Sequence, residues 1–254
     1  LLKDILRGQL RRLTFAGSTK ILKYNLDGTF VTDYDLGERL NKPKLSLNPD
    51  GSISLVHLCF QGMSEMMGAV ITPDSTITKY IPAPGQAINP RDKNGSFVGF
   101  NNEIWSYNNV EGFKYMMMPV DTLYNYNATA NKMEAQFALS NPPVGEDVFL
   151  IYDELPGKYL ATVWGKGTIV VDNKNNNSHY VKLVNDYFGG LPAPMNFTNG
   201  WFFAMYEPAV LMENIEKRMA ASDCTDKDKE LLKGLLESLD ENDNNVMFIG
   251  KLKK

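Results

Sequence analysis

Short apolar strands alternate with turn sequences along most of this chain, and this regularity constrains its fold most strongly. Three turn sequences each separate two β-rich runs, namely Asp27-Gly28, Pro49-Asp50-Gly51 and Pro73-Asp74-Ser75. Asp-Gly turns favour antiparallel hairpins, because glycine accepts the positive φ that tight turns require. The same alternation continues at Pro156-Gly157 and Asn199-Gly200. Many short strands at even spacing predict an all-β sandwich, barrel or propeller.

The spacing of the turns distinguishes among these three architectures. One class of hairpin turn recurs at intervals of about 43–54 residues, at Gly51, Glu103, Gly157 and Gly200. A second class alternates with it, and a proline-bearing connection follows each second-class hairpin. The repeating unit is two hairpins, or four strands, which is the blade of a β-propeller. We therefore predict an all-β propeller with four-stranded blades.

The number of units is incomplete for a closed ring. Three whole units lie between about Lys44 and Asp186, with a partial unit at Leu13–Leu36 and one hairpin at Met195–Tyr206. That amounts to about four and a half blades. Because an open array exposes its end blades, we expect an N-terminal portion of the parent to be absent here, or closure by other means. The whole chain, 1–254, is predicted to be one partial propeller domain.

The middle unit has the least regular pattern. We predict a hairpin between 96–100 and 104–108, with its turn at Asn101-Asn102. The strands 113–118 and 132–139 would then flank a long, Asn-rich connection without strand structure.

A helical insertion is predicted at 207–241, followed by a closing strand at 246–252. Pro208 suits a first helical turn, and Thr225, with an aspartate three residues later, forms a capping box for a second helix. The predicted buried stripe of that helix is Leu231, Leu232, Leu235, Leu236 and Leu239. The final strand must return to an earlier sheet, because a lone strand leaves its backbone groups unpaired. We expect it to join the hairpin Met195–Met205 as an inner or middle strand.

Composition gives little support to several classes of function. The formal net charge of −4 gives no reason to expect nucleic acid or an anionic membrane as partner. No apolar run reaches the ~18 residues of a transmembrane helix. Cys59 and Cys224 are predicted to be free thiols, because a disulfide framework or metal site needs more Cys, or Cys and His at ligand spacing.

No catalytic or cofactor-binding motif emerges. His57 and His179 lie in strand patterns, and a metal centre or His-based triad would require the fold to bring one of them to carboxylates. The acidic run from Asp240 fails as a calcium-binding loop, because its sixth and twelfth positions are Asn245 and Lys251 rather than Gly and Glu. We therefore predict no catalytic residue, no metal and no cofactor.

A series of aromatic residues provides the one candidate binding site. These aromatics fall on or near the second strand of successive first-class hairpins, with two carboxylates beside one of them. The predicted site residues are Trp105, Tyr107, Tyr152, Asp153, Glu154 and Trp164. Aromatics at equivalent blade positions either pack between blades or surround one mouth of the central channel, where propellers bind ligands. In the second case, the carboxylates would supply polar contacts.

Two C-terminal stretches carry a resemblance to a known family. The two stretches are GWFFAMYEP (Gly200–Pro208) and LLESLDENDNNVMFIGKLK (Leu235–Lys253). Both resemble the C-terminal end of a six-bladed β-propeller family of Bacteroides-type bacteria. The hairpins at Asp27-Gly28 and Pro49-Asp50-Gly51 also look like that family's blades. The family typically has Asp-Asn-Pro before its last strand, whereas Asn245 stands in the place of that proline here.

The resemblance implies six blades, so roughly the first one and a half would be missing from this chain. It implies an extracytoplasmic location, in the periplasm or at the cell surface. It also implies a secretion or lipoprotein signal, and with it a lipid anchor, on the missing N-terminal part. It implies no activity, because the family has no well-defined biochemical function and no catalytic motif.

Three functions remain open from the sequence. The leading prediction is a non-enzymatic, extracytoplasmic binding or scaffold protein for an unknown small molecule, glycan or protein, based on fold analogy and the lack of a catalytic constellation. The first alternative is a hydrolase or lyase acting at the channel mouth, which carboxylates clustered with His57 or His179 would favour. The second is a protein-docking module using the C-terminal helices, which an exposed apolar patch would favour.

Overall fold

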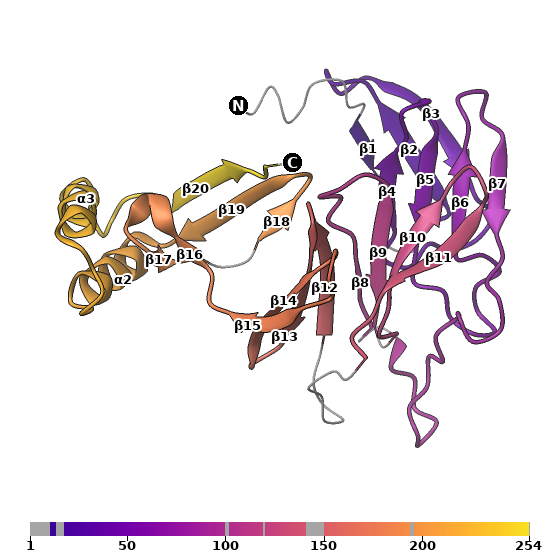
Figure 1. The fold of residues 1–254 in the computed structure, drawn as a ribbon. Helices are drawn as coiled ribbons and strands as arrows, with labels where there is room; N and C mark the ends of the chain where they lie inside the picture. Colours follow the sequence, from indigo (N-terminus) through magenta and orange to yellow (C-terminus); the bar gives the residue numbers. More distant parts are fainter. Residues whose placement is uncertain are drawn as a thin grey trace. The chain divides into compact units, whose positions relative to one another are not determined.

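A computed structural model describes residues 11–13, 18–99, 102–118, 120–140, 150–193 and 196–253. They form a mostly β protein of propeller-like antiparallel sheets with two helices near the C-terminus (Figure 1). This confirms the predicted fold class. The chain divides into two compact units. Unit 1 comprises Leu1–Ser106 and Gly112–Pro142, and unit 2 comprises Tyr107–Glu111 and Pro143–Lys254.

The described residues of unit 1 form three antiparallel sheets whose strands pair in chain order. The first consists of β1 (Arg11–Leu13), β2 (Lys20–Tyr24) and β3 (Phe30–Asp35). The second consists of β4 (Lys44–Leu47), β5 (Ile53–Val56), β6 (Gly68–Ile71) and β7 (Ile77–Tyr80). The third consists of β8 (Ile104–Trp105), β9 (Phe113–Met117), β10 (Leu123–Asn127) and β11 (Lys132–Phe137). The last two sheets have the four strands expected of a blade.

The second sheet of unit 1 is buried on both faces. Ile53 and Leu55 of β5 belong to one apolar cluster, together with Ile21 of the first sheet. Val56 and Val70 belong to another cluster, with aromatic residues of the third sheet. Because successive strand residues point to opposite faces, every residue of β5 and β6 is buried.

The third sheet corrects the predicted middle unit. In place of the predicted hairpin's first strand, Phe97 forms an isolated bridge with Arg91, and β8 pairs with β9. The strand that the sequence did not predict is β10. It lies inside the predicted Asn-rich connection and pairs with both β9 and β11. Its sequence LYNYN alternates aromatic and amide residues, so strand alternation outweighed the turn preference of asparagine. Residues 100 and 101 lie outside the described part of the chain.

In the described part of unit 2, the strands form one four-stranded sheet and two smaller antiparallel sheets. The large sheet consists of β12 (Leu150–Leu155), β13 (Lys158–Val163), β14 (Gly167–Asp172) and β15 (Ser178–Val181). A short hairpin follows, made of β16 (Val184–Asn185), the 3₁₀ turn η2 (Asp186–Phe188) and β17 (Leu191–Pro192). The last sheet consists of β18 (Phe197–Thr198), β19 (Trp201–Tyr206) and β20 (Val246–Lys251). Met195, expected to begin a strand, lies outside the described residues.

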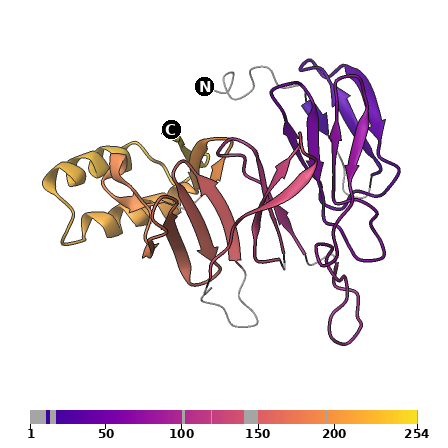
Figure 2. The same ribbon diagram turned by 45° about the vertical axis from the view of Figure 1, so that its right-hand side comes forward.

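The two predicted helices are α2 (Pro208–Met219) and α3 (Asp226–Glu237), which lie side by side in Figures 1 and 2. The Thr225 hydroxyl accepts the Asp228 N–H at 3.2 Å, so the predicted cap is confirmed. Leu232 is fully buried in the cluster that the helices form with β17, β19 and β20. Leu231, predicted to be buried, is 38% exposed, because it points away from that cluster.

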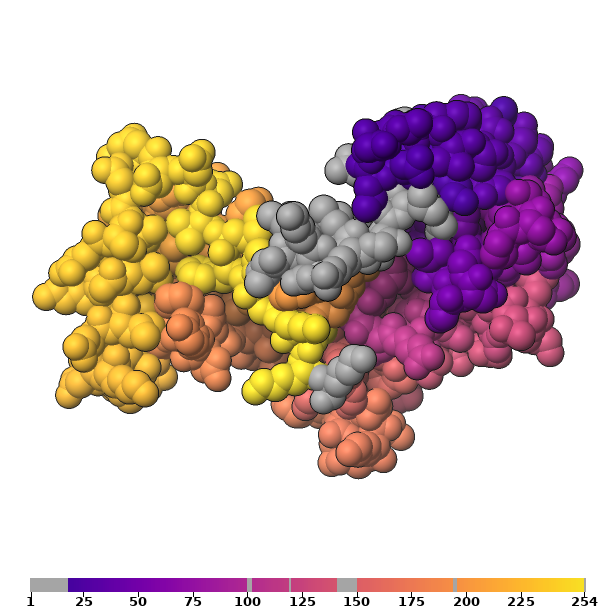
Figure 3. All heavy atoms as spheres, turned by 90° about the horizontal axis from the view of Figure 1, so that it is seen from above, coloured from indigo at the N-terminus to yellow at the C-terminus, as the bar shows by residue number. Residues whose placement is uncertain are grey.

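The closing strand returns to the last sheet as predicted. β20 pairs with β19 residue for residue, from Trp201 opposite Lys251 to Tyr206 opposite Val246. In the described sheet, β20 is the edge strand, because the order is β18-β19-β20. Figure 3 shows the C-terminal residues, in yellow, at the surface of unit 2.

Both cysteines are free and buried, as the sequence predicted for their redox state. Cys59 lies in unit 1, and Cys224 packs between the two helices of unit 2. In the part of the chain that the structure describes, no helix is long and apolar enough to span a membrane.

Candidate ligand-binding site

The turn between β16 and β17 forms one side of a groove in unit 2. The side chain of Asn185 accepts the Phe188 N–H at 3.3 Å, which closes the 3₁₀ turn. Gly189 and Gly190 follow with φ angles of 59° and 81°, a left-handed conformation that glycine adopts without strain. The pair reverses the chain so that β17 pairs with β16.

Arg218 of α2 is fixed against this glycine turn. Its Nε donates to the Gly189 carbonyl at 2.7 Å, and its Nη1 pairs with Asp223 Oδ1 at 2.5 Å. The hydrogen bond and charge of Asp223 raise the pKa of Arg218, and the same contacts lower the pKa of Asp223. A Cβ atom on Gly190 would lie 3.0 Å from Arg218 Nε. Glycine at 190 therefore leaves the space that the guanidinium occupies.

The groove lies between α2 and the β16–β17 hairpin and has a volume of about 460 Å³. Its lining residues come from the β15–β16 connection, the hairpin, α2 and the segment after α2. They are Lys182, Val184, Gly190, Pro192, Asn214, Lys217, Arg218, Ala221 and Asp223. The Tyr206 hydroxyl donates to the Pro192 carbonyl, which holds β17 against β19 beside the groove.

The groove lining is cationic, although the chain as a whole carries a net charge of −4. Among the described residues of the lining, Lys182, Lys217 and Arg218 outnumber the one carboxylate, Asp223. Lys217 also contacts Glu213 at 2.5 Å, but both side chains are mostly exposed, so the pair is weak and exchangeable. The lining can therefore accept a negative group.

Two of the predicted site residues, Tyr107 and Asp153, lie close together in unit 2. Asn109 connects them to the β18–β19 turn: its Nδ2 donates to Asp153 Oδ2 at 2.8 Å, and its Oδ1 accepts the Gly200 N–H at 3.0 Å. The Tyr107 carbonyl accepts the Asn199 N–H at 2.7 Å. Asn109, which the sequence did not single out, is thus the central residue of this cluster.

Burial changes the acidity of both groups in this cluster. It raises the pKa of Asp153 to about 7, although the Glu154 N–H and Asn109 partly oppose the shift. Burial, together with the nearby charge of Asp153, raises the pKa of Tyr107 to about 12. Asp153 therefore changes its charge near neutral pH.

The other predicted site residues occupy different environments. The side chain of Tyr152 is only 1% exposed and lies in the interior, on the opposite face of β12 from Asp153. Trp164 is 68% exposed, directly after β13. Glu154 follows Asp153 on β12, and Trp105 lies in unit 1, opposite Met116 in the β8–β9 pair. The binding role of these residues stays a prediction.

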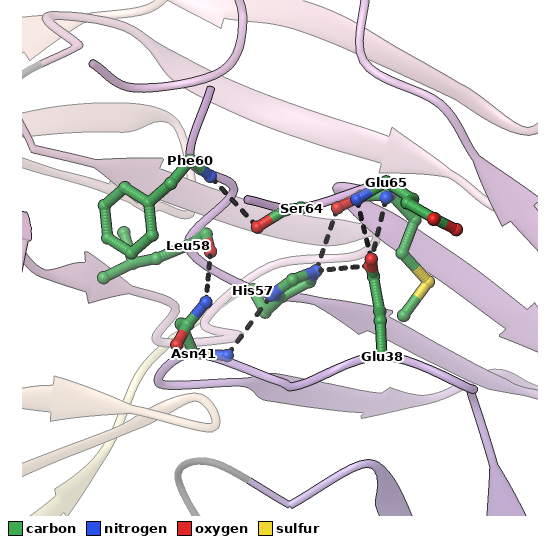
Figure 4. A network of polar contacts seen from close by, with 8 residues as sticks. Glu38, Asn41, His57, Leu58, Phe60, Ser64 and Glu65 are labelled. Carbon is green, nitrogen blue, oxygen red and sulfur yellow. Dashed lines mark hydrogen bonds and ion pairs between the residues drawn. The ribbon is translucent and has the colours of Figure 1, made fainter. Parts of the chain in front are cut away.

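His57 lies in a closed polar network in unit 1 (Figure 4). Its Nδ1 accepts the Asn41 N–H at 3.3 Å and its Nε2 contacts the Met66 carbonyl at 2.9 Å, which places the ring proton on Nε2. Glu38 lies 3.5 Å from Nε2 and accepts the N–H groups of Glu65 and Met66. The fold thus brings one carboxylate to His57.

This network is closed to substrates. The His57 side chain is completely buried, and both of its ring nitrogens contact the main chain. Burial, with the charge of Glu38, raises the pKa of Cys59 to about 11, so this thiol is not an activated nucleophile. His179 is exposed on β15. Within the described residues, no group of three or more His, Cys, Asp or Glu could hold a metal ion.

Comparisons with known proteins support the fold. No protein-family model and no curated protein matches the sequence. The structure is similar to that of a "putative exported protein" from Bacteroides fragilis, with 13% identity and a TM-score of 0.55, over 95% of this chain and 74% of that chain. Because the identity is low, this likeness shows the fold alone. It establishes a structural match to a Bacteroides protein, and membership of the six-bladed family stays a prediction.

Two further solved structures are less similar. Virginiamycin B lyase from Staphylococcus aureus has 15% identity and a TM-score of 0.41, over 68% of this chain and 52% of that chain. An auxiliary nutrient binding protein from Bacteroides thetaiotaomicron has 9% identity and a TM-score of 0.37, over 66% of this chain and 37% of that chain. At these values neither structure indicates a function for this chain.

The groove was not predicted from the sequence. Its two cationic sides, Lys182 and Lys217-Arg218, are separated by the β16–β17 hairpin and β19, so no local motif joins them. The one available signal was Gly189-Gly190, a glycine pair next to a proline-bearing connection. Such a pair marks a tight turn and space for a close contact, which Arg218 fills.

Proposed function

We propose that this protein is a non-enzymatic, extracytoplasmic binding protein whose small-molecule ligand occupies the groove beside α2. The proposal rests on the size of this groove. Its volume of about 460 Å³ falls in the usual range of small-molecule sites, about 300–1,000 Å³. Arg218 and its glycine turn form a side that is fixed before any ligand arrives. A preformed site of this kind binds without the cost of ordering a loop.

The chemistry of the lining favours binding over catalysis. Arg218 stays protonated and cannot act as a base, and its contact with Asp223 lowers the pKa of that carboxylate. Among the described residues that line the groove, none is a Ser, Thr, Cys or His that could serve as an activated nucleophile or general base. The described lining therefore has the donors to hold a ligand.

The extracytoplasmic location is the second part of the proposal. It is supported by the sequence resemblance to secreted propellers and by the fold likeness to the Bacteroides fragilis protein named as exported. Cell fractionation with an antibody against this chain tests it directly, in cells that produce the natural full-length protein. Recovery in the cytosolic fraction alone would remove this part of the proposal.

Filling the groove tests the binding function. Ala221→Phe and Val184→Trp place large side chains in the groove from two different elements, and Val184 is already 48% exposed, so the second change should not disturb folding. Ala209→Phe is the control, because Ala209 is exposed on α2 and does not line the groove. Saturation-transfer NMR with a library of neutral and charged small molecules should find ligands for the wild type and the control that both filled variants lose. Ligands that survive both changes would place binding elsewhere.

A further inference from the structure

We propose, resting on the binding function proposed above, that the groove selects organic anions: small molecules with a carboxylate or sulfate group on an apolar or ring-shaped body. Three features of the lining lead to this ligand class. They are a fixed guanidinium, two adaptable ammonium groups and an apolar surface between them.

The fixed cation is Arg218. Its contacts with Gly189 and with the side chain and carbonyl of Asp223 use three of the five guanidinium N–H donors. The remaining two donors belong to the two terminal nitrogens of the same planar group. Each of them can donate one hydrogen bond to an oxygen of a carboxylate or sulfate.

The adaptable cations are Lys182 and Lys217. Lys182 lies in the short connection between β15 and β16 and is exposed, so its long side chain can move over the groove. Lys217 contacts Glu213, but side-chain exposures of 68% and 61% make this ion pair easy to exchange. Each ammonium can therefore approach a ligand anion without breaking a buried interaction.

The apolar part of the lining excludes a bare inorganic ion as the best ligand. Val184, Pro192 and Ala221 lie along the groove, and Val184 is 48% exposed. A small inorganic ion would leave this surface in contact with water, whereas a ring or hydrocarbon body would cover it.

Backbone amide NMR of the whole chain tests this ligand class at the groove itself. The probes are glucuronate and glucose, which share a pyranose ring and differ in the carboxylate, together with acetate and sulfate. We expect glucuronate to shift the amide signals of Gly190 and Ala221, with acetate and sulfate weaker and glucose inactive at the same concentration. Added sodium chloride should weaken the response, because salt screens exposed charges.

Two variants connect the response to the lysines. Lys182→Ala should weaken glucuronate binding by about 3- to 10-fold, and Lys182→Glu should weaken it further. Lys227→Ala is the matched control, because Lys227 is an exposed lysine of α3 in the same unit that does not line the groove. It should leave the affinity unchanged. If Lys182→Ala and Lys227→Ala lost the same affinity for glucuronate, the effect would come from the overall charge of the protein, and the proposal would be contradicted.

The possible results distinguish a failure of anion selection from a failure of small-molecule binding in the groove. If glucose shifts Gly190 and Ala221 as strongly as glucuronate does, or if the anions shift only signals elsewhere, selection of organic anions is wrong. Neutral ligands that the filled variants lose would then still support the binding function. If the library and the anions all fail to respond at the groove, both proposals fall together.

Discussion

The second sheet of unit 1 and the last sheet of unit 2 are both antiparallel, but they are buried in different ways. In the first, all four residues of β5 and all four of β6 are buried. In the second, residues of β20 alternate between half-buried and exposed along the whole strand. The β5–β6 sheet packs against a neighbouring sheet on each face, whereas β20 packs against the helices with one face only.

The uncovered face of the last sheet carries large apolar side chains. Met205 lies opposite Met247 and Phe203 opposite Ile249, so all four share one face. Met205 and Met247 are 55% and 52% exposed. A sheet packed on both faces thus buries the residue at every strand position, including the polar Ser54 of β5, whereas a sheet packed on one face buries residues only at alternate positions.

The largest expected effect is the loss of a two-sided core residue. Leu55→Ala removes a fully buried side chain from the β5–β6 sheet and should lower the free energy of unfolding by about 2–5 kcal/mol. Ile249→Ala on the uncovered face, at 44% exposure, should cost less than about 1 kcal/mol. Urea unfolding followed by circular dichroism measures both. Equal costs would show that the two sheets are covered alike and would overturn the comparison.

The second effect distinguishes the units by pH. Because the folded pKa of Asp153, about 7, exceeds its ordinary value of 3.8, its stabilising contribution is complete below about pH 4. This contribution to the free energy of unfolding, on the order of 2–4 kcal/mol in total, is lost as the pH rises through 7. Asp153→Asn keeps an acceptor for Asn109 and should therefore stabilise unit 2 at pH 8 and flatten its pH dependence. Fluorescence of Trp164 and Trp201, in a variant without Trp105, reports on unit 2 alone. A less stable variant at pH 8 would contradict the predicted burial cost.

Glu38 should give unit 1 the opposite pH response. Burial opposes its ionisation, but hydrogen bonds from His57 and from the N–H groups of Glu65 and Met66 prevail and lower its pKa below 4.5. Its contribution is therefore present above pH 4.5 and is lost as the pH falls through the lower folded pKa. Glu38→Gln should cost about 1–2 kcal/mol at pH 7 and little in acid. Trp105 fluorescence, in a variant without the other two tryptophans, follows unit 1. A cost that does not depend on pH would refute the charged role of Glu38.

The sequence predicted the elements that depend on local chemistry. Four such elements are confirmed, because each depends on neighbouring residues or on simple strand alternation. They are the hairpins at Asp27-Gly28 and Pro49-Asp50-Gly51, the Thr225 cap and the closing strand. β10 was not predicted, because its asparagines favour turns although they lie in an alternating strand. The groove could not be predicted, because Lys182 and Arg218 meet only through tertiary packing.

Glycine-to-alanine substitutions in the two regions should have opposite signs, and the smallest expected effect is that at Gly234. Gly234 lies inside α3 and a Cβ there would meet no atom within 4 Å, so Gly234→Ala should stabilise unit 2 by about 0.5–1 kcal/mol through helix propensity. At Gly68, in the two-sided sheet, a Cβ would lie 2.7 Å from the Leu55 carbonyl oxygen. Because that oxygen belongs to the backbone of the adjacent strand, Gly68→Ala should cost about 1–3 kcal/mol. Thermal unfolding of both variants gives the two signs, and a stabilised Gly68→Ala protein would mean that β5 and β6 are less tightly packed than their complete burial indicates.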